Sequence, residues 1–192
     1  MTSFLRQLSA AARMLLALTL ICGVVYPLVI LGVGQVVAKN QANGSLVHTA
    51  SGPVGSSLIG QAFTEGQWFH GRPSASDYAG NTSGGSNLGP LDDRQRKAMD
   101  ERRAALLDAN PHASGSLPAD ALTASASGLD PDVSAAYAMW QVPRVAKARS
   151  LPEVQVRQLV LLNTQGRIAG FLGQPRVNVL ELNLALESQL PN

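Results

Sequence analysis

The chain has 192 residues, with 15 Lys or Arg against 13 Asp or Glu and a net charge of +2. Two of the basic residues, Arg6 and Arg13, lie near the N-terminus, so residues 39–192 are neutral overall. This neutrality argues against a nucleic-acid partner, which requires concentrated positive charge. The single cysteine, Cys22, excludes a disulfide within the chain and a metal site built from several cysteines.

The first predicted element is a transmembrane helix over residues 14–38, which are 25 consecutive residues without a formal charge. At about 1.5 Å per residue such a helix spans about 37 Å, enough to cross a hydrocarbon core of about 30 Å. Pro27 predicts a bend, which membrane helices tolerate. Gly32, Gly34 and Ala38 form a small-residue face on which another helix could pack; a lipid-facing anchor with incidental glycines is the alternative.

The distribution of charge predicts the topology. Arg6 and Arg13 have no acidic neighbours, and the positive-inside rule therefore keeps residues 1–13 in the cytoplasm. Residues 14–38 then cross the membrane once, in contact with lipid, and residues 39–192 form one extracytoplasmic domain. A cleaved signal peptide is an alternative, but its apolar region should run only about 7–15 residues. A lipoprotein anchored through Cys22 is disfavoured by the bulky side chain of the preceding residue, Ile21.

The first part of the outward domain is predicted to be rich in loops, because ten of the 18 glycines fall between Gly44 and Gly89. The residues expected in a linker or loop off the membrane are Asn43, Gly44, Ser51, Gly52 and Pro53. Two apolar pairs bounded by glycine, residues 58–59 and 68–69, predict short strands.

The second part is predicted to be mainly helical. A charged helix is expected over residues 92–107, ending near Asn110 and Pro111. Asp130 and Pro131 predict the N-cap and first position of a helix through residues 135–141. Pro143 is expected to break or restart that helix, leaving residues 144–149 as a short basic turn.

The C-terminal elements are predicted from capping patterns. Ser150 and Glu153 form a capping box for a helix that reaches Asn163 and stops at Gly166. Residues 167–172 predict a short strand, and Asn178 with Glu181 predicts the cap of a last helix. A strand is the alternative for this last element, because leucines alternate at residues 180–186. The whole pattern predicts an α+β fold: one N-terminal transmembrane helix followed by a single domain with a small sheet and several helices.

No local pattern predicts catalysis or a metal site. The glycine- and serine-rich residues 84–88 lack the second glycine of a nucleophile elbow. His48, His70 and His112 lack the helical spacing of zinc ligands. The P-loop and G-x-G-x-x-G patterns are absent from the sequence, so a bound nucleotide is not predicted from them. The sequence predicts a non-catalytic chain with no metal and no cofactor of its own.

Two acidic pairs are explained by helix capping, since negative charge is favourable at a helix N-terminus. These pairs are Asp92 with Asp93, and Asp130 with Asp132.

A serine-glycine-glycine stretch is the one segment with a possible nucleotide association. Some transport ATPases contact nucleotide through such a signature, which here comprises Ser83, Gly84, Gly85, Ser86 and Asn87. A tight turn that requires positive φ explains the same residues equally well.

Several motifs, taken together and in this order behind one N-terminal anchor, closely resemble one family. They are GSSLIGQ at residues 55–61 followed by Phe63, FHGRPS at 69–74, SGGSNLGP at 83–90, TASASGLDP at 123–131, QV and RVA within 141–146, and RVNVL and LN within 176–183. The family is the C subunit of the Kdp-type potassium-transporting P-type ATPase.

The resemblance implies a small accessory subunit of a bacterial inner-membrane complex that imports potassium at the expense of ATP. Its implied partners are a channel-like potassium-binding subunit and a P-type, ATP-hydrolysing subunit, which handle the potassium and the ATP. The family is described as a catalytic chaperone that raises the ATP affinity of the hydrolysing subunit through the serine-glycine-glycine region. The predicted topology instead places Ser83 to Asn87 across a membrane from ATP, which favours a role in assembly or gating. A membrane-anchored periplasmic binding module or hydrolase is the alternative.

Overall fold

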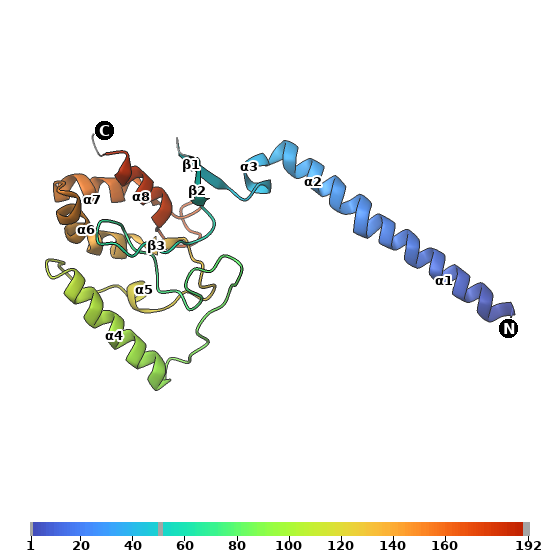
Figure 1. Ribbon diagram of the computed structural model, residues 1–192, viewed down its shortest axis with the longest axis horizontal. Helices are drawn as coiled ribbons and strands as arrows, with labels where there is room; N and C mark the ends of the chain where they lie inside the picture. The colour runs from blue at the N-terminus through green and yellow to red at the C-terminus, as the bar shows by residue number, and fades with distance from the viewer. Residues whose placement is uncertain (1, 50–51, 190–192) are drawn as a thin grey trace. The chain divides into compact units, whose positions relative to one another are not determined.

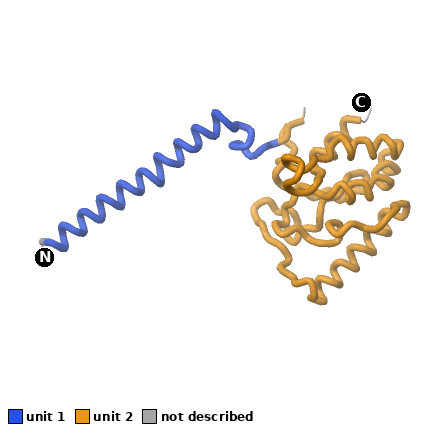
Figure 2. The backbone as a smooth tube through the Cα atoms, turned by 180° about the vertical axis from the view of Figure 1, so that it is seen from behind, with its two compact units in different colours: residues 1–46 blue, residues 47–192 orange. Residues whose placement is uncertain are grey.

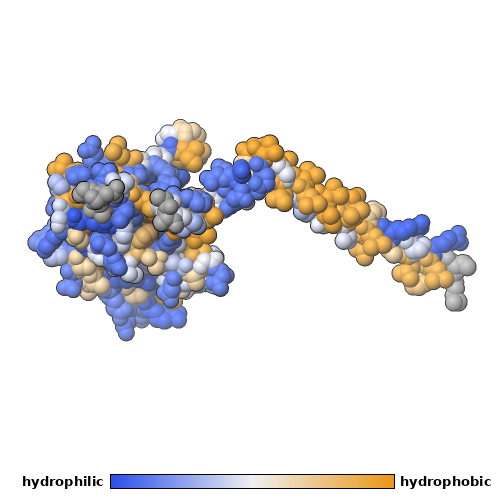
Figure 3. Space-filling model, turned by 45° about the horizontal axis from the view of Figure 1, so that its top comes forward, coloured by the Kyte–Doolittle hydropathy of each residue, from blue (hydrophilic) through white to orange (hydrophobic). Residues whose placement is uncertain are grey.

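A continuous helical rod forms the first unit of the computed structural model, which describes residues 2–49 and 52–189 (Figure 1). The rod consists of α1 (Thr2–Leu20), a π-helical turn η1 (Ile21–Val25) and α2 (Tyr26–Val37). Within it, Ser3–Val37 is long and apolar enough to cross a membrane. Figure 3 shows hydrophobic surface along most of this rod. The N-terminal apolar helix predicted from the sequence is therefore present.

The π-helical turn shows how the rod accommodates Pro27. Proline lacks a backbone N–H and its ring clashes with the carbonyl four residues earlier, which here belongs to Gly23. The turn directly before Pro27 is widened, and the N–H of Tyr26 donates to the carbonyl of Ile21, five residues back. A single π-helical turn inside an α-helix is the usual form of such an irregularity.

The chain folds back on itself after α2. Ala38 ends the helix, and the short helix α3 (Lys39–Ala42) follows. A Cβ built on Gly34 would lie 3.6 Å from the Cβ of Ala42, so part of the predicted small-residue face lies against the chain's own next turn. Gln35 and Asn43 exchange two side-chain hydrogen bonds of 3.2 and 3.3 Å.

The remaining unit, residues 47–192, contains helices and small sheets (Figure 2). Strands β1 (Leu46–Thr49) and β2 (Gly52–Ser56) pair as a two-stranded sheet. Asn43 and Gly44 form a turn as predicted, but the loop predicted at Gly52 and Pro53 is wrong, because both lie in β2. Proline is tolerated there because every strand of a two-stranded sheet is an edge strand. Ser51, also predicted as loop, lies outside the described residues.

In the described residues that follow, five helices and a three-stranded sheet are joined by long loops. The helices are α4 (Asp93–Ala109), α5 (Ala119–Leu122), α6 (Ala135–Arg149), α7 (Glu153–Leu162) and α8 (Val179–Glu187). The antiparallel sheet has the order β3-β5-β4, with β3 (Asp132–Ser134), β5 (Arg176–Asn178) and β4 (Thr164–Gln165). The predicted α+β class is therefore confirmed.

The core lies where α6, α7 and α8 pack together beside the sheet (Figure 1). Its fully buried apolar side chains include Val142, Val145, Val160, Val177 and Leu182. Removing such side chains from water is the main favourable contribution to folding, at about 25 cal/mol per Å² of apolar surface. This burial outweighs several local signals in the chain.

The helix predicted to have its N-cap at Asp130 has its N-cap four residues later, at Ser134. Ser134 is the N-cap of α6, and its hydroxyl oxygen accepts a hydrogen bond from the N–H of Tyr137 at 3.0 Å. The intervening residues form β3, in which Val133 pairs with Val177 of β5. A sheet partner that is distant in the sequence therefore replaces the first turn that Pro131 predicted.

The break predicted at Pro143 is also wrong, because α6 continues through it to Arg149. A proline inside a helix costs about 3 kcal/mol. Val142 and Val145, which flank Pro143 and its successor, are fully buried, and α6 makes its most extensive contacts with α7. Helical packing on this face offsets the cost of the proline.

The C-terminal predictions hold in part. The helices over α4, α7 and α8 are confirmed, and Asn178 caps α8 through a 3.1 Å hydrogen bond from the N–H of Glu181. The capping box is wrong, because Ser150 is the left-handed C-cap of α6 at φ 54°. The predicted strand at residues 167–172 is a turn closed by two 3.0 Å hydrogen bonds between Ile168 and Leu172.

Two buried amide side chains explain why residues 68–69 do not form the predicted strand. Asn183 of α8 accepts from the Phe69 N–H at 2.8 Å and donates to its carbonyl at 3.0 Å. Gln141 of α6 accepts from the His70 N–H at 2.8 Å and donates to its carbonyl at 3.1 Å. These carboxamides satisfy the backbone groups that a neighbouring strand would otherwise pair. Residues 58–59, also predicted as a strand, are likewise irregular.

Candidate functional site

The motif-bearing loops come together on one side of the domain. We define the loop cluster as residues 71–78, 83–90 and 123–131. These three segments lie far apart in the sequence, and the hydrogen bonds between them are mostly from side chains to backbone carbonyls. The cluster therefore depends on tertiary structure and not on any regular element within it.

Arg72 and Asp130 form the ion pair that joins two of these loops. The Arg72 Nη1 lies 3.0 Å from Asp130 Oδ2, and its Nη2 donates to the Thr123 carbonyl at 3.4 Å. The side chains of both ions are only about a quarter exposed, at 26% and 29%. The other Asp130 oxygen accepts from the Asp132 N–H at 3.0 Å, which fixes the carboxylate in orientation.

Ser74 is a hydrogen-bonding centre inside the cluster. Its Oγ donates to the Gly128 carbonyl at 2.7 Å and accepts from the N–H groups of Ser76 and Tyr78 at 3.1 and 3.0 Å. The Tyr78 hydroxyl donates to the Arg72 carbonyl. Burial, followed by the nearby Asp130 carboxylate, raises the pKa of Tyr78 to about 12, so the phenol stays protonated and remains a donor.

The signature loop, Ser83 to Asn87, is held against residues 126–128 by hydrogen bonds and close backbone contact. The Gly84 N–H donates to the Ser127 carbonyl at 2.8 Å, and the Ser83 hydroxyl donates to the same carbonyl at 3.1 Å. A Cβ on Gly85 would lie 2.9 Å from the Ala126 carbonyl oxygen. Gly85 is therefore required by close approach of two backbones, which is one of the roles that glycine serves.

The sequence interpretation of this loop needs one correction. Neither Gly84, Gly85 nor Gly89 has positive φ, whereas Asn87 does, at 52°. Asparagine is among the few residues that adopt this left-handed conformation readily. Ser86 and Asn87 are exposed, so the braced loop presents an uncharged hydroxyl and an uncharged amide to its surroundings.

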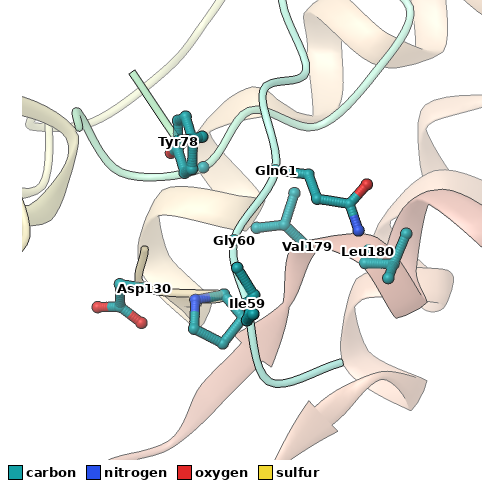
Figure 4. A pocket seen from close by; sticks show the side chains of 9 residues that line it. Ile59, Gly60, Gln61, Tyr78, Asp130, Val179 and Leu180 are labelled. Atoms are coloured by element: carbon teal, nitrogen blue, oxygen red, sulfur yellow. The ribbon is translucent and has the colours of Figure 1, made fainter. Parts of the chain in front are cut away.

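A narrow recess lies next to the cluster, around Gly60 (Figure 4). Tyr78 and Asp130 border it from the loops, and Val179 and Leu180 border it from α8. The Gly60 N–H donates to the Leu129 carbonyl at 2.9 Å, and a Cβ on Gly60 would lie 2.4 Å from the Asp130 carbonyl oxygen. The recess is a packing contact between backbones and has no room for a ligand.

The pairing of Asp130 with Asp132 has a different cause from the predicted helix capping. Asp130 pairs with Arg72, and Asp132 Oδ2 lies 3.0 Å from Arg176 Nε. Both carboxylates line an open cavity of about 450 Å³ together with the two arginines and Asp120. Burial raises the pKa of Asp132 despite the opposing effect of Arg176. For Asp92, the N-cap role is confirmed by a 2.9 Å hydrogen bond from the Arg94 N–H.

The polar side chains of the loop cluster are held in place by hydrogen bonds, which suits the cluster to the recognition of a partner. The hydroxyls of Ser74 and Ser83 are both committed to backbone carbonyls. The ring of His70 contacts the Glu65 carbonyl at 3.0 Å. Within residues 2–49 and 52–189, no group of three His, Cys, Asp or Glu side chains could hold a metal ion.

The motifs included Ser74, Gln141 and Asn183, but sequence patterns assigned no structural role to them or to Tyr78. The available signal was a polar residue at a position where the helical pattern predicts an apolar one, since Gln141 and Asn183 interrupt apolar helical faces. Buried amides are nearly always hydrogen-bonded, so such residues indicate a specific distant partner.

Comparison with known proteins identifies the class to which this chain belongs. Residues 8–188 match the family described as the c chain of the K+-transporting ATPase. The Potassium-transporting ATPase KdpC subunit of Beijerinckia indica subsp. indica is 48% identical over 189 residues, covering 97% of this chain and 96% of the relative. The protein of the same description from Caulobacter vibrioides is 49% identical over 176 residues, covering 90% and 88%.

The chain belongs to this family and is a subunit of a potassium-transporting ATPase. The family resemblance predicted from its motifs is therefore confirmed. Membership implies a complex with partner subunits.

Proposed function

We propose that this subunit supports assembly or gating of the potassium pump through its loop cluster, at the outward face of the membrane. In this proposal the signature loop docks onto a partner subunit, and the way the loop is held supports that docking role. Its N-terminal half is held by Ser127, whereas Ser86 and Asn87 are exposed. Loops positioned by a rigid scaffold commonly form recognition surfaces.

The proposed partners are a channel-like potassium-binding subunit and a P-type, ATP-hydrolysing subunit. We propose that ATP and potassium are handled by those subunits, and that this chain is not itself catalytic. The purified full chain should then show no ATPase activity above a denatured sample. A turnover abolished by one serine or aspartate substitution would contradict the proposal.

The proposed topology has residues 1–13 in the cytoplasm, residues 14–38 in the membrane and residues 39–192 in the periplasm. Arg6 and Arg13 before the apolar stretch support it through the positive-inside rule. Protease added to intact spheroplasts should digest the domain. Complete protection would refute this orientation. It would then favour the role attributed to the family, in which Ser83 to Asn87 contact the nucleotide directly.

The docking role is tested by Asn87→Gly in the tagged full chain, expressed together with its partner subunits. Glycine accepts the φ of 52° at Asn87, so the backbone can stay as it is while the amide is lost. Recovery of the complex and potassium uptake should fall, while the melting temperature of the isolated chain stays within about 2 °C of the wild type, because the substitution preserves the backbone conformation.

The matched control is Asn81→Gly. Asn81 is exposed and its only described hydrogen bond is a 3.4 Å contact with Thr82. Complex recovery should be normal in this variant. If Asn87→Gly also assembles and transports normally, the signature loop is a folding element and the docking role is wrong.

A further inference from the structure

A basic pocket lies on another part of the domain, where the end of α4 meets α6 and residues 64–70. Its volume is about 520 Å³. Four basic side chains line it, and no Asp or Glu is found among its described lining residues. The basic side chains are His70, His112, Arg144 and Lys147.

The positive charge of the pocket is not neutralised by the protein. Arg144 donates to two neutral acceptors, the Gly66 carbonyl and Gln141 Oε1, the latter at 2.7 Å. No ion pair within the described ranges involves Arg144 or Lys147. The nearby Glu65 carboxylate instead accepts from Gln67 Nε2 at 2.7 Å.

Three other half-buried arginines of this domain are paired with carboxylates. Arg72, Arg149 and Arg176 each lie 2.9–3.0 Å from a carboxylate. Burial of a positive charge is costly unless an opposite charge compensates it. Among the described ion pairs there is none for Arg144 or for the half-buried Arg102, which donates to the Leu122 carbonyl at 2.8 Å. Of these two arginines, Arg144 lines the basic pocket.

The environment disfavours positive charge in the absence of a ligand. Burial lowers the pKa of Arg144, and burial together with the Arg144 charge lowers the pKa of His70. A bound anion would reverse both effects, because opposite charge nearby favours the protonated form.

The residues that line the pocket indicate the kind of anion that it would bind. Pro111, Pro143 and alanines supply apolar walls, so donors are concentrated on the basic side chains. Arg and Lys are the residues that most often hold phosphate oxygens. Asn110 also lines the pocket, and its side chain is held in place because its Nδ2 donates to the Trp140 carbonyl at 2.7 Å.

We infer that this pocket binds a phosphate group, with Arg144, Lys147 and His112 as its donors. The group comes either from inorganic phosphate or from a phospholipid headgroup. The pocket is connected to the loop cluster through Gln141. Its side chain forms hydrogen bonds both with Arg144 and with the backbone of His70, which is two residues before Arg72.

The test is a titration of the full chain in neutral detergent with inorganic phosphate at constant ionic strength. Thermal unfolding is followed by tryptophan fluorescence, and both tryptophans, Trp68 and Trp140, report on the domain. Specific binding raises the melting temperature with the logarithm of the phosphate concentration once that concentration exceeds the dissociation constant, whereas the effect of an excluded salt grows in proportion to its concentration.

The decisive variant is Lys147→Gln combined with His112→Gln, which removes two exposed donors. The apparent affinity for phosphate should fall at least about tenfold, corresponding to about 1.4 kcal/mol. Lys97→Gln combined with His48→Gln is the matched control, because it makes the same chemical changes at exposed positions elsewhere. This control should bind phosphate like the wild type.

Two further arms distinguish the sources and protect against misfolding. Glycerol 3-phosphate that binds at least about tenfold tighter than phosphate, by about 1.4 kcal/mol, indicates a lipid headgroup; equal affinity indicates inorganic phosphate. Calorimetric titration of the wild type gives a readout independent of the variants. A lack of saturable binding in the wild type, or equal loss of affinity in both double variants, would overturn the inference.

Discussion

Replacing Asn183 by Ala should destabilise the domain strongly, although Asn183 lies outside the loop cluster. Asn183 and Phe69 are 2% and 0% exposed, so water does not reach the backbone groups that the amide satisfies. The substitution leaves one buried N–H and one buried carbonyl unpaired. Each unsatisfied group costs about 1–3 kcal/mol, which gives a total of about 4 kcal/mol at the middle of that range.

This loss is large compared with the total stability of an ordinary domain, about 5–15 kcal/mol. For a domain of this size, 1 kcal/mol lowers the melting temperature by about 2–4 °C. Asn183→Ala should therefore lower it by about 8–16 °C. The assay is thermal unfolding of the full chain in detergent, followed by the fluorescence of Trp68 and Trp140, which reports on the domain.

Asn81→Ala is the matched control, because Asn81 is exposed and its loss should change stability by less than about 0.5 kcal/mol. Asn183→Asp keeps an acceptor for the Phe69 N–H but turns a carboxylate oxygen toward the Phe69 carbonyl. It should be destabilising as well. A loss below about 1 kcal/mol for Asn183→Ala would refute the role assigned to this amide.

Three further predictions concern the surroundings of the loop cluster. Gly60→Ala should cost about 1–3 kcal/mol through overpacking, because its Cβ would lie 2.4 Å from a carbonyl oxygen, whereas Gly66→Ala has open space and should be neutral in the same unfolding assay. The pKa of His70 is lowered from 6.5 by burial, so the unfolded chain binds more protons below that pH; stability should fall on acidification from pH 7.5 to 5, and less so in His70→Gln. If His70→Gln follows the wild-type pH profile, this contribution is absent. Tyr78→Phe should leave Tyr137 alone ionising near pH 12 in an ultraviolet titration, since the pKa of each phenol is raised to about 12; an unchanged titration would contradict the burial of Tyr78.

Local sequence signals determined the elements whose stability is mostly local. The charge-free stretch predicted the apolar helix because a membrane-spanning helix needs only length and apolar composition. The helices α4 and α8 followed from caps at Asp92 and Asn178, whose hydrogen bonds join residues two or three positions apart. The ordered set of loop motifs indicated the family before the geometry of those loops was known.

Tertiary structure decided the elements that depend on distant partners. Local capping at Asp130 lost to strand pairing of Val133 with Val177, and the break expected at Pro143 lost to burial of its neighbours. The cap expected at Ser150 lost because that residue ends α6.

The candidate site shows the same division. Sequence alone identified the serine-glycine-glycine segment, but its support by Ser127 crosses 44 positions in the chain. The residues of the Arg72–Asp130 ion pair are 58 positions apart. The hydrogen bonds between the Asn183 side chain and the Phe69 backbone join residues 114 positions apart. A residue's own neighbourhood contains no information about such partners, because the folded core, not local propensity, brings them within hydrogen-bonding distance.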